Sequence, residues 1–274
     1  SRIAKIIDTY CTPGSGKWFE NPACYYLTSL NCWTTLFIHL QHHGLISIDE
    51  VPRLKEFMRW GVLLLTPPTP GHDAMRDGLA PEAYEVAEKK RRIAPVGDHA
   101  HLGPSIIDNV AILAECYKAI DPEYADLLRW AYHEAGADGA YHGNPMLLFI
   151  HGNDWVLRKP DTEPELPSRR LEGFGAVLRG QQNQPDESYL LLKLGPGGYR
   201  YHNTEGSIIF FANGKPLIYD GGEAGETWRH STLSFYANHT MLAPGHVERF
   251  FDSDSFGFTQ GVSPKVLKPG EPNY

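Results

Sequence analysis

The residue types best suited to chemistry lie in one glycine-rich stretch of the second half, GPGGYRYHNTEGSIIFFANGKPLIYDGG, residues 195–222. His202 stands just before a strand pattern, and Asp220 follows the strand that returns. Asn213 and Gly214 lie between the two strands, and this pair is typical of a two-residue turn whose central residues both need positive φ. A hairpin of this length brings His202 and Asp220 to the same end of the sheet.

An imidazole and a carboxylate placed together at a sheet end can share a divalent metal ion, and zinc is the usual choice for such ligands. The predicted zinc site therefore contains His202 and Asp220, with His230 or His239 as the third ligand. A structural hydrogen bond between His202 and Asp220 explains the same pattern equally well.

Other charged or glycine-rich stretches of the sequence give weaker indications of function. The GSGK segment at residues 14–17 is superficially similar to a phosphate loop, but Trp18 replaces the required Ser or Thr and no strand precedes it. Basic residues cluster at 89–92 and at 169–170, and both clusters are predicted to be solvated faces.

The elements that must position the candidate residues change character along the chain. The first half has the helical recurrence of apolar residues, broken by capping and stop signals such as Ser105, Gly44 and Pro67. The sequence predicts four helices: Cys24–His43, Val51–Leu65, Ser105–Ala119 and Pro122–Ala135. Helices that follow one another without intervening strands indicate stacked helical hairpins in a bundle or toroid.

The second half alternates like strands. Four strands are predicted: Gly175–Arg179, Tyr189–Leu194, Ser207–Ala212 and Pro216–Tyr219. No crossover helix separates them, so an antiparallel sandwich is expected rather than a parallel sheet. The proline-rich segment KPDTEPELPSRR, residues 159–170, is the predicted linker between a helical domain at 1–158 and a β-sandwich domain at 171–274.

Composition restricts the partners. The 274 residues carry a formal net charge of −8, which argues against nucleic acid as a ligand and requires a local cationic cleft if the substrate is acidic. No apolar run approaches the length of a membrane span, so no membrane association is expected. The four cysteines have no metal-finger spacing and allow three disulfide pairings without selecting one.

The stretch from His202 to Asp220 resembles the start of the β-sandwich in heparinase II/III-like polysaccharide lyases. In that family a histidine-rich turn leads into a strand, an Asn-Gly turn, a second strand and an Asp followed by Gly. The resemblance implies an (α/α) toroid that begins upstream of Ser1, an antiparallel β-sandwich, and zinc bound by His202, Asp220 and a later histidine. His230, followed by Ser231 and Thr232, matches that third ligand slightly better than His239.

The helical half supports the same resemblance. In these lyases an acidic residue precedes a catalytic tyrosine by five positions at the start of a helix, and Glu20 and Tyr25 of ENPACYY have that spacing, with Tyr26 as the neighbouring alternative. PVGD at residues 95–98 also looks like a turn of the family, with His99 and His101 beside it.

Two positions depart from the family pattern. Arg200 replaces the first histidine of the H-x-H pair, and Thr204 replaces the usual Asp two residues after the second histidine. These departures also make His202 a candidate for the catalytic or charge-neutralising group itself.

The implied reaction is β-elimination, in which a uronic acid loses its C5 proton once its carboxylate is neutralised. Tyr25 is the predicted general acid and a candidate base, His202 the base or neutraliser, and Arg200 a partner for the substrate carboxylate. The expected substrate is an acidic polysaccharide, and the expected location is secreted or periplasmic. The sequence leaves the particular sugar and the oligomeric state open.

Two other functions compete with this interpretation. A glycoside hydrolase on a helical toroid needs two carboxylates flanking the bond, for which Glu20, Asp98 and Glu205 are available. A non-catalytic glycan-binding module needs neither acid nor base.

Overall fold

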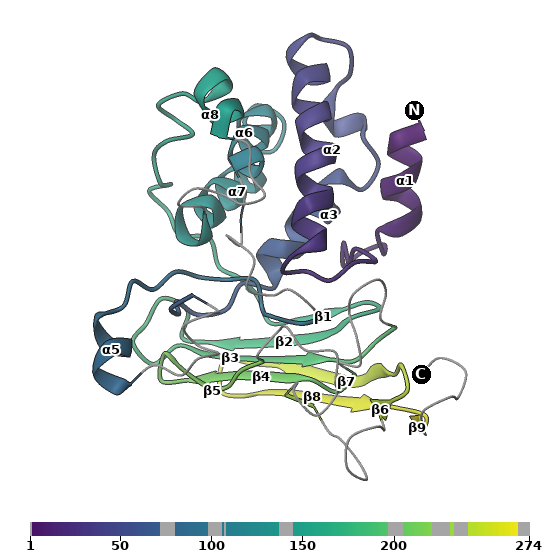
Figure 1. Ribbon diagram of the computed structural model, residues 1–274, viewed down its shortest axis with the longest axis vertical. Helices are drawn as coiled ribbons and strands as arrows, with labels where there is room; N and C mark the ends of the chain where they lie inside the picture. Colours follow the sequence, from purple (N-terminus) through teal and green to yellow (C-terminus); the bar gives the residue numbers. More distant parts are fainter. Residues whose placement is uncertain are drawn as a thin grey trace.

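The computed structural model describes residues 2–71, 80–97, 106, 108–136, 145–196, 205–220, 231–232 and 241–267. Most of its helices gather on one side of the molecule and its strands on the other, whereas the short helix α5, Pro81–Val86, lies beside the sheet (Figure 1). The first strand begins at Arg169, within the predicted linker 159–170. The division into separate domains at that linker stays a prediction.

Seven α-helices and one 3-10 helix occur among the described residues. Their bounds are α1 Arg2–Tyr10, α2 Tyr25–His42, η1 Ile48–Glu50, α3 Leu54–Leu63, α5 Pro81–Val86, α6 Asp108–Tyr117, α7 Pro122–Ala135 and α8 Pro145–His151. The four predicted helices are confirmed as α2, α3, α6 and α7, while α1, α5 and α8 were not predicted. Figure 1 shows α6 and α7 beside each other, and α6 also packs on α2 and α8. Closure of these helices into a toroid stays a prediction.

Helix α7 illustrates how local sequence sets an element. The Asp121 side chain accepts a hydrogen bond from the Tyr124 N–H and caps the helix, and Pro122 occupies its first turn, where no N–H is needed. Leu128 and Trp130 are buried in the core. The predicted bounds of this helix are therefore confirmed at both ends.

A five-stranded sheet runs in chain order. Its strands are β1 Arg169–Leu171, β2 Gly175–Gly180, β3 Ser188–Lys193, β4 Ile208–Ala212 and β5 Lys215–Ile218, and every neighbouring pair is antiparallel. The β4–β5 turn has φ of 53° at Asn213 and 65° at Gly214, as the sequence predicts. The antiparallel sheet is confirmed, because each strand pairs in the opposite direction with the next strand along the chain.

Two small sheets accompany the large one. The hairpin of β7 His246–Asp252 and β8 Gly257–Val262 contacts β2, and β6 Met241–Leu242 pairs with β9 Val266–Leu267. At Gly261 an added Cβ would lie 2.1 Å from Leu194 Cδ2, so β8 approaches the large sheet very closely. The described fold is thus mixed α and β, with a second β layer against part of the sheet.

Buried polar contacts join the helical part to the sheet. Arg91 is 1% exposed and donates to both carboxylate oxygens of Glu187 at 2.8 Å. The prediction that residues 89–92 form a solvated face is therefore wrong for Arg91. A guanidinium can be buried when a carboxylate meets it in bidentate geometry, and nothing in the local basic run reveals a partner 96 positions away.

Candidate functional site at the junction of helices and sheet

Most of the predicted zinc and catalytic residues lie outside the described residues. Arg200 and His202 fall within residues 197–204, and His230 and His239 fall within 221–230 and 233–240. The turn residues Asp98, His99 and His101 also lie outside. Of this site, the structure describes Tyr25, Asp220 and the residues that flank 197–204.

A buried ion pair joins Lys193 to Glu205, two described residues on either side of 197–204. Lys193 and Glu205 are 0% and 4% exposed, and the Lys193 ammonium contacts Glu205 Oε1. Glu205 Oε2 accepts the Gly195 N–H at 2.9 Å, and Lys193 Nζ donates to the Gly195 carbonyl at 2.9 Å. Since every charged atom of the pair is used, the described residues on the two sides of 197–204 are held together.

Sequence reasoning missed this pair, although a signal was present. Strand β3 alternates between half-buried and buried positions, and Lys193 falls on the buried series with Tyr189 and Leu191. A lysine at a core position of a strand predicts a buried anionic partner.

Lys17 connects the segment before α2 to Pro196, the last described residue before 197–204. It is 5% exposed, and its Nζ donates to the Pro196 carbonyl at 2.5 Å. Burial lowers the pKa of Lys17 from 10.5 to about 8. Nearby, Ser15 Oγ donates to the Glu172 carbonyl at 2.8 Å. The GSGK segment therefore joins the helical part to the sheet through Ser15 and Lys17.

The two tyrosines at the start of α2 have different environments. Tyr26 is fully buried, its hydroxyl donates to the Phe57 carbonyl at 2.7 Å, and burial raises its pKa. Tyr25 is half-buried, and its N–H donates to Asn21 Oδ1 at 3.0 Å. Of the two, Tyr26 is a core residue, and only Tyr25 is partly accessible to a substrate.

Two of the carboxylates considered for glycoside hydrolysis, Glu20 and Glu205, lie among the described residues, and both are bound by neighbouring side chains. Glu20 Oε2 accepts from Trp18 Nε1 at 2.8 Å and from Ser29 Oγ at 2.6 Å, and Glu205 is buried against Lys193. Within the described residues, neither Glu20 nor Glu205 is arranged as one of two acids flanking a bond.

Asp220 follows strand β5 and is 2% exposed. Among the described residues, no three His, Cys, Asp or Glu side chains are arranged to hold a metal ion. The zinc site of His202, Asp220 and His230 or His239 stays a prediction.

Comparison with known proteins identifies a fold. A solved structure of a heparinase III with methylated lysines superimposes with a TM-score of 0.55 at 13% sequence identity, covering 96% of this chain and 36% of that one. The chain thus spans about a third of the length of that heparinase and has a polysaccharide-lyase-like fold. No protein-family profile and no curated protein matches the sequence.

Each helix of the described chain is too short or too polar to cross a lipid bilayer.

Proposed function

We propose that this protein is a polysaccharide lyase that cleaves a uronic-acid-containing polysaccharide by β-elimination. The observation that carries the proposal is the fold, because the likeness to a heparinase III extends over both the helices and the sheet. The Lys17–Pro196 contact adds support, since it joins the segment leading to Tyr25 with the start of the loop that holds Arg200 and His202. A substrate at this junction would meet side chains from both parts.

The proposed roles follow from the chemistry of elimination. Arg200 neutralises the substrate carboxylate through its planar fork, which makes the C5 proton more acidic. His202 removes that proton or assists in neutralising the carboxylate, and Tyr25 donates a proton to the departing glycosidic oxygen. Tyr25 is suited to this last role because it begins α2 and is half-buried.

Zinc is proposed as the ion that fixes the geometry of the loops, with His202, Asp220 and His230 or His239 as ligands. Asp220 offers a carboxylate that is already withdrawn from solvent, as is usual for a structural ligand. The proposed substrate places the protein in a secreted or periplasmic location.

The test of the function is incubation with a panel of uronic-acid polysaccharides, read by ultraviolet absorbance. Only elimination forms the conjugated unsaturated uronate that absorbs, whereas hydrolysis shortens the chain without it. Tyr25→Phe removes one hydroxyl and should reduce turnover by about 100-fold or more at nearly unchanged stability.

Tyr10→Phe is the matched control, because Tyr10 is 47% exposed at the end of α1 and has no proposed role. It should retain full activity. Chain shortening without new absorbance would replace the lyase by a hydrolase, and binding without any shortening would leave a glycan-binding module.

A further inference from the structure

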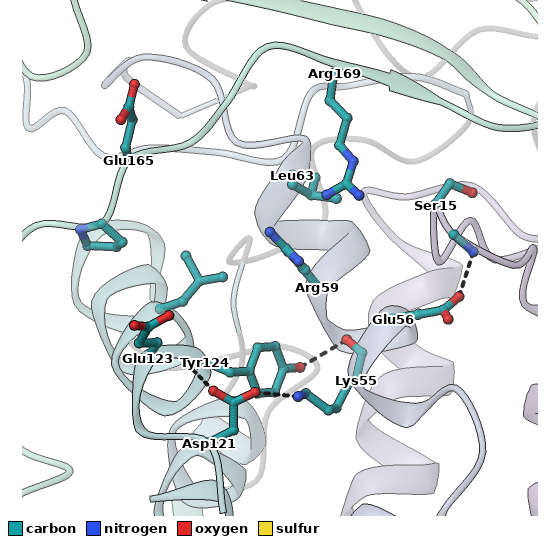
Figure 2. A pocket seen from close by; sticks show the side chains of 13 residues that line it. Ser15, Lys55, Glu56, Arg59, Leu63, Asp121, Glu123, Tyr124, Glu165 and Arg169 are labelled. Atoms are coloured by element: carbon teal, nitrogen blue, oxygen red, sulfur yellow. Dashed lines mark hydrogen bonds and ion pairs between the residues drawn. The ribbon is translucent and has the colours of Figure 1, made fainter.

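A pocket of about 540 Å³ lies where α3, the start of α7 and strand β1 come together (Figure 2). Pockets of this size accept small molecules or one or two sugar rings. None of its lining residues belongs to the proposed catalytic or zinc site. The pocket is therefore a feature that the proposed reaction does not use.

Two arginines dominate one side of this pocket. Arg59 comes from α3 and Arg169 is the first residue of β1, and Figure 2 shows their guanidinium groups directed toward each other. Within the described part of the chain, neither side chain forms a hydrogen bond or an ion pair, and Arg59 Nε is buried without an acceptor. Burial, followed by the charge of Arg169, lowers the pKa of Arg59.

Among the described residues no carboxylate forms an ion pair with either arginine, although Asp121 attracts Arg59 electrostatically. Asp121 is bound by the Lys55 ammonium, and Glu56 Oε2 accepts the Gly14 N–H at 2.8 Å. Glu123 and Glu165 also line the pocket, but Figure 2 shows both well apart from the two guanidinium groups. Two adjacent cations in a partly desolvated place, with no carboxylate bound directly to either one within the described residues, repel each other.

We propose that Arg59 and Arg169 together bind one oxyanion group, a sulfate or a carboxylate, carried by an acidic sugar. An oxyanion between two guanidinium groups accepts several charge-assisted hydrogen bonds and removes their mutual repulsion. The pocket has room for the sugar ring beside the charged group. That the oxyanion belongs to an acidic sugar rests on the proposed function, whereas the anion site itself rests on the pocket alone.

The test is calorimetric titration and thermal unfolding of the protein with three probes: sodium sulfate, glucuronate and a sulfated uronate disaccharide. Sodium chloride at equal ionic strength controls for general screening. The variants are Arg59→Met and Arg169→Gln, which lie on different elements and so are not expected to fail to fold for the same reason. Arg170→Gln is the matched control, because Arg170 neighbours Arg169 on β1 but is exposed and lies 3.6 Å from Glu172.

The expected result is that the disaccharide binds more tightly than sulfate and raises the unfolding temperature. Either variant should weaken binding about tenfold or more, as for loss of a hydrogen bond to a charged group. Arg170→Gln should leave binding unchanged. Without ligand, Arg59→Met should unfold at the same or a higher temperature, since it relieves a repulsion, whereas a purely structural arginine would lower that temperature.

Two outcomes overturn the proposal. Equal binding by the native protein and both variants would remove the anion site, and binding of sulfate without binding of either sugar would remove the saccharide as its ligand. Because neither measurement requires turnover, failure of this site is distinguishable from failure of the proposed lyase activity.

Discussion

Replacing Lys17 by methionine should change how the stability of the protein depends on pH. The Lys17 ammonium is buried at the junction of helices and sheet and donates to the Pro196 carbonyl. Burial lowers its pKa from 10.5 to about 8, because the charged form is poorly solvated there. Methionine fills a similar volume and cannot take up a proton.

The direction of this pH dependence follows from the number of protons that the folded and the unfolded states bind. Between about pH 8 and pH 10.5 the unfolded chain holds a proton that folded Lys17 has lost, so the free energy of unfolding rises with pH across this window. A shift of about 2.5 units, the difference between 10.5 and about 8, corresponds to about 3 kcal/mol in total. Most of this free energy, about 2–3 kcal/mol, should be added to the stability of the native protein between about pH 7 and pH 10.

The variant also loses the hydrogen bond to Pro196, at a cost of about 1–3 kcal/mol that does not depend on pH. At about pH 7 the two effects oppose each other, so Lys17→Met should lie close to the native protein in stability. At about pH 10 only the lost hydrogen bond remains, and the variant should be clearly less stable.

Urea unfolding of the native protein and Lys17→Met at the two pH values measures this difference directly. Lys5→Met is the control, since Lys5 is exposed on α1, and its difference from the native protein should stay constant with pH. Parallel pH profiles for the native protein and Lys17→Met would refute the assignment of a buried, charged Lys17.

Three further changes test other parts of the structure. Glu205→Gln should destabilise the protein by about 3–5 kcal/mol in urea unfolding, because it leaves a buried ammonium without its counter-charge; the exposed Glu248→Gln should change stability by less than about 0.5 kcal/mol. Gly214→Ala should lower the unfolding free energy by about 1–3 kcal/mol, since its φ is 65° and the new Cβ would lie 2.9 Å from the Pro185 carbonyl oxygen; a neutral result would mean that the turn relaxes. Elemental analysis should find about one zinc per chain, lost in Asp220→Asn, and chelation should lower the unfolding temperature; absence of zinc from both proteins would remove the metal proposal.

Residue patterns were sufficient for the elements whose signals are local. Helix α7 was predicted at its observed bounds because Pro122 starts it and Gly136 follows it, and the β4–β5 turn was predicted from Asn213 and Gly214. Helix α8 and strands β6 to β9 were missed, since they are short or lack such flanking signals.

For the candidate site, the sequence determined which residue types are present and placed Tyr25 first, with Tyr26 left open as the neighbouring alternative. Only the tertiary structure separated the two tyrosines, because burial of the Tyr26 hydroxyl against the Phe57 carbonyl depends on how α2 packs on α3. The same holds for Lys193 with Glu205, for Lys17 with Pro196 and for the facing guanidinium groups of Arg59 and Arg169. Charge and side-chain type are properties of a residue, whereas desolvation and pairing are properties of its surroundings, and those form only when distant segments pack.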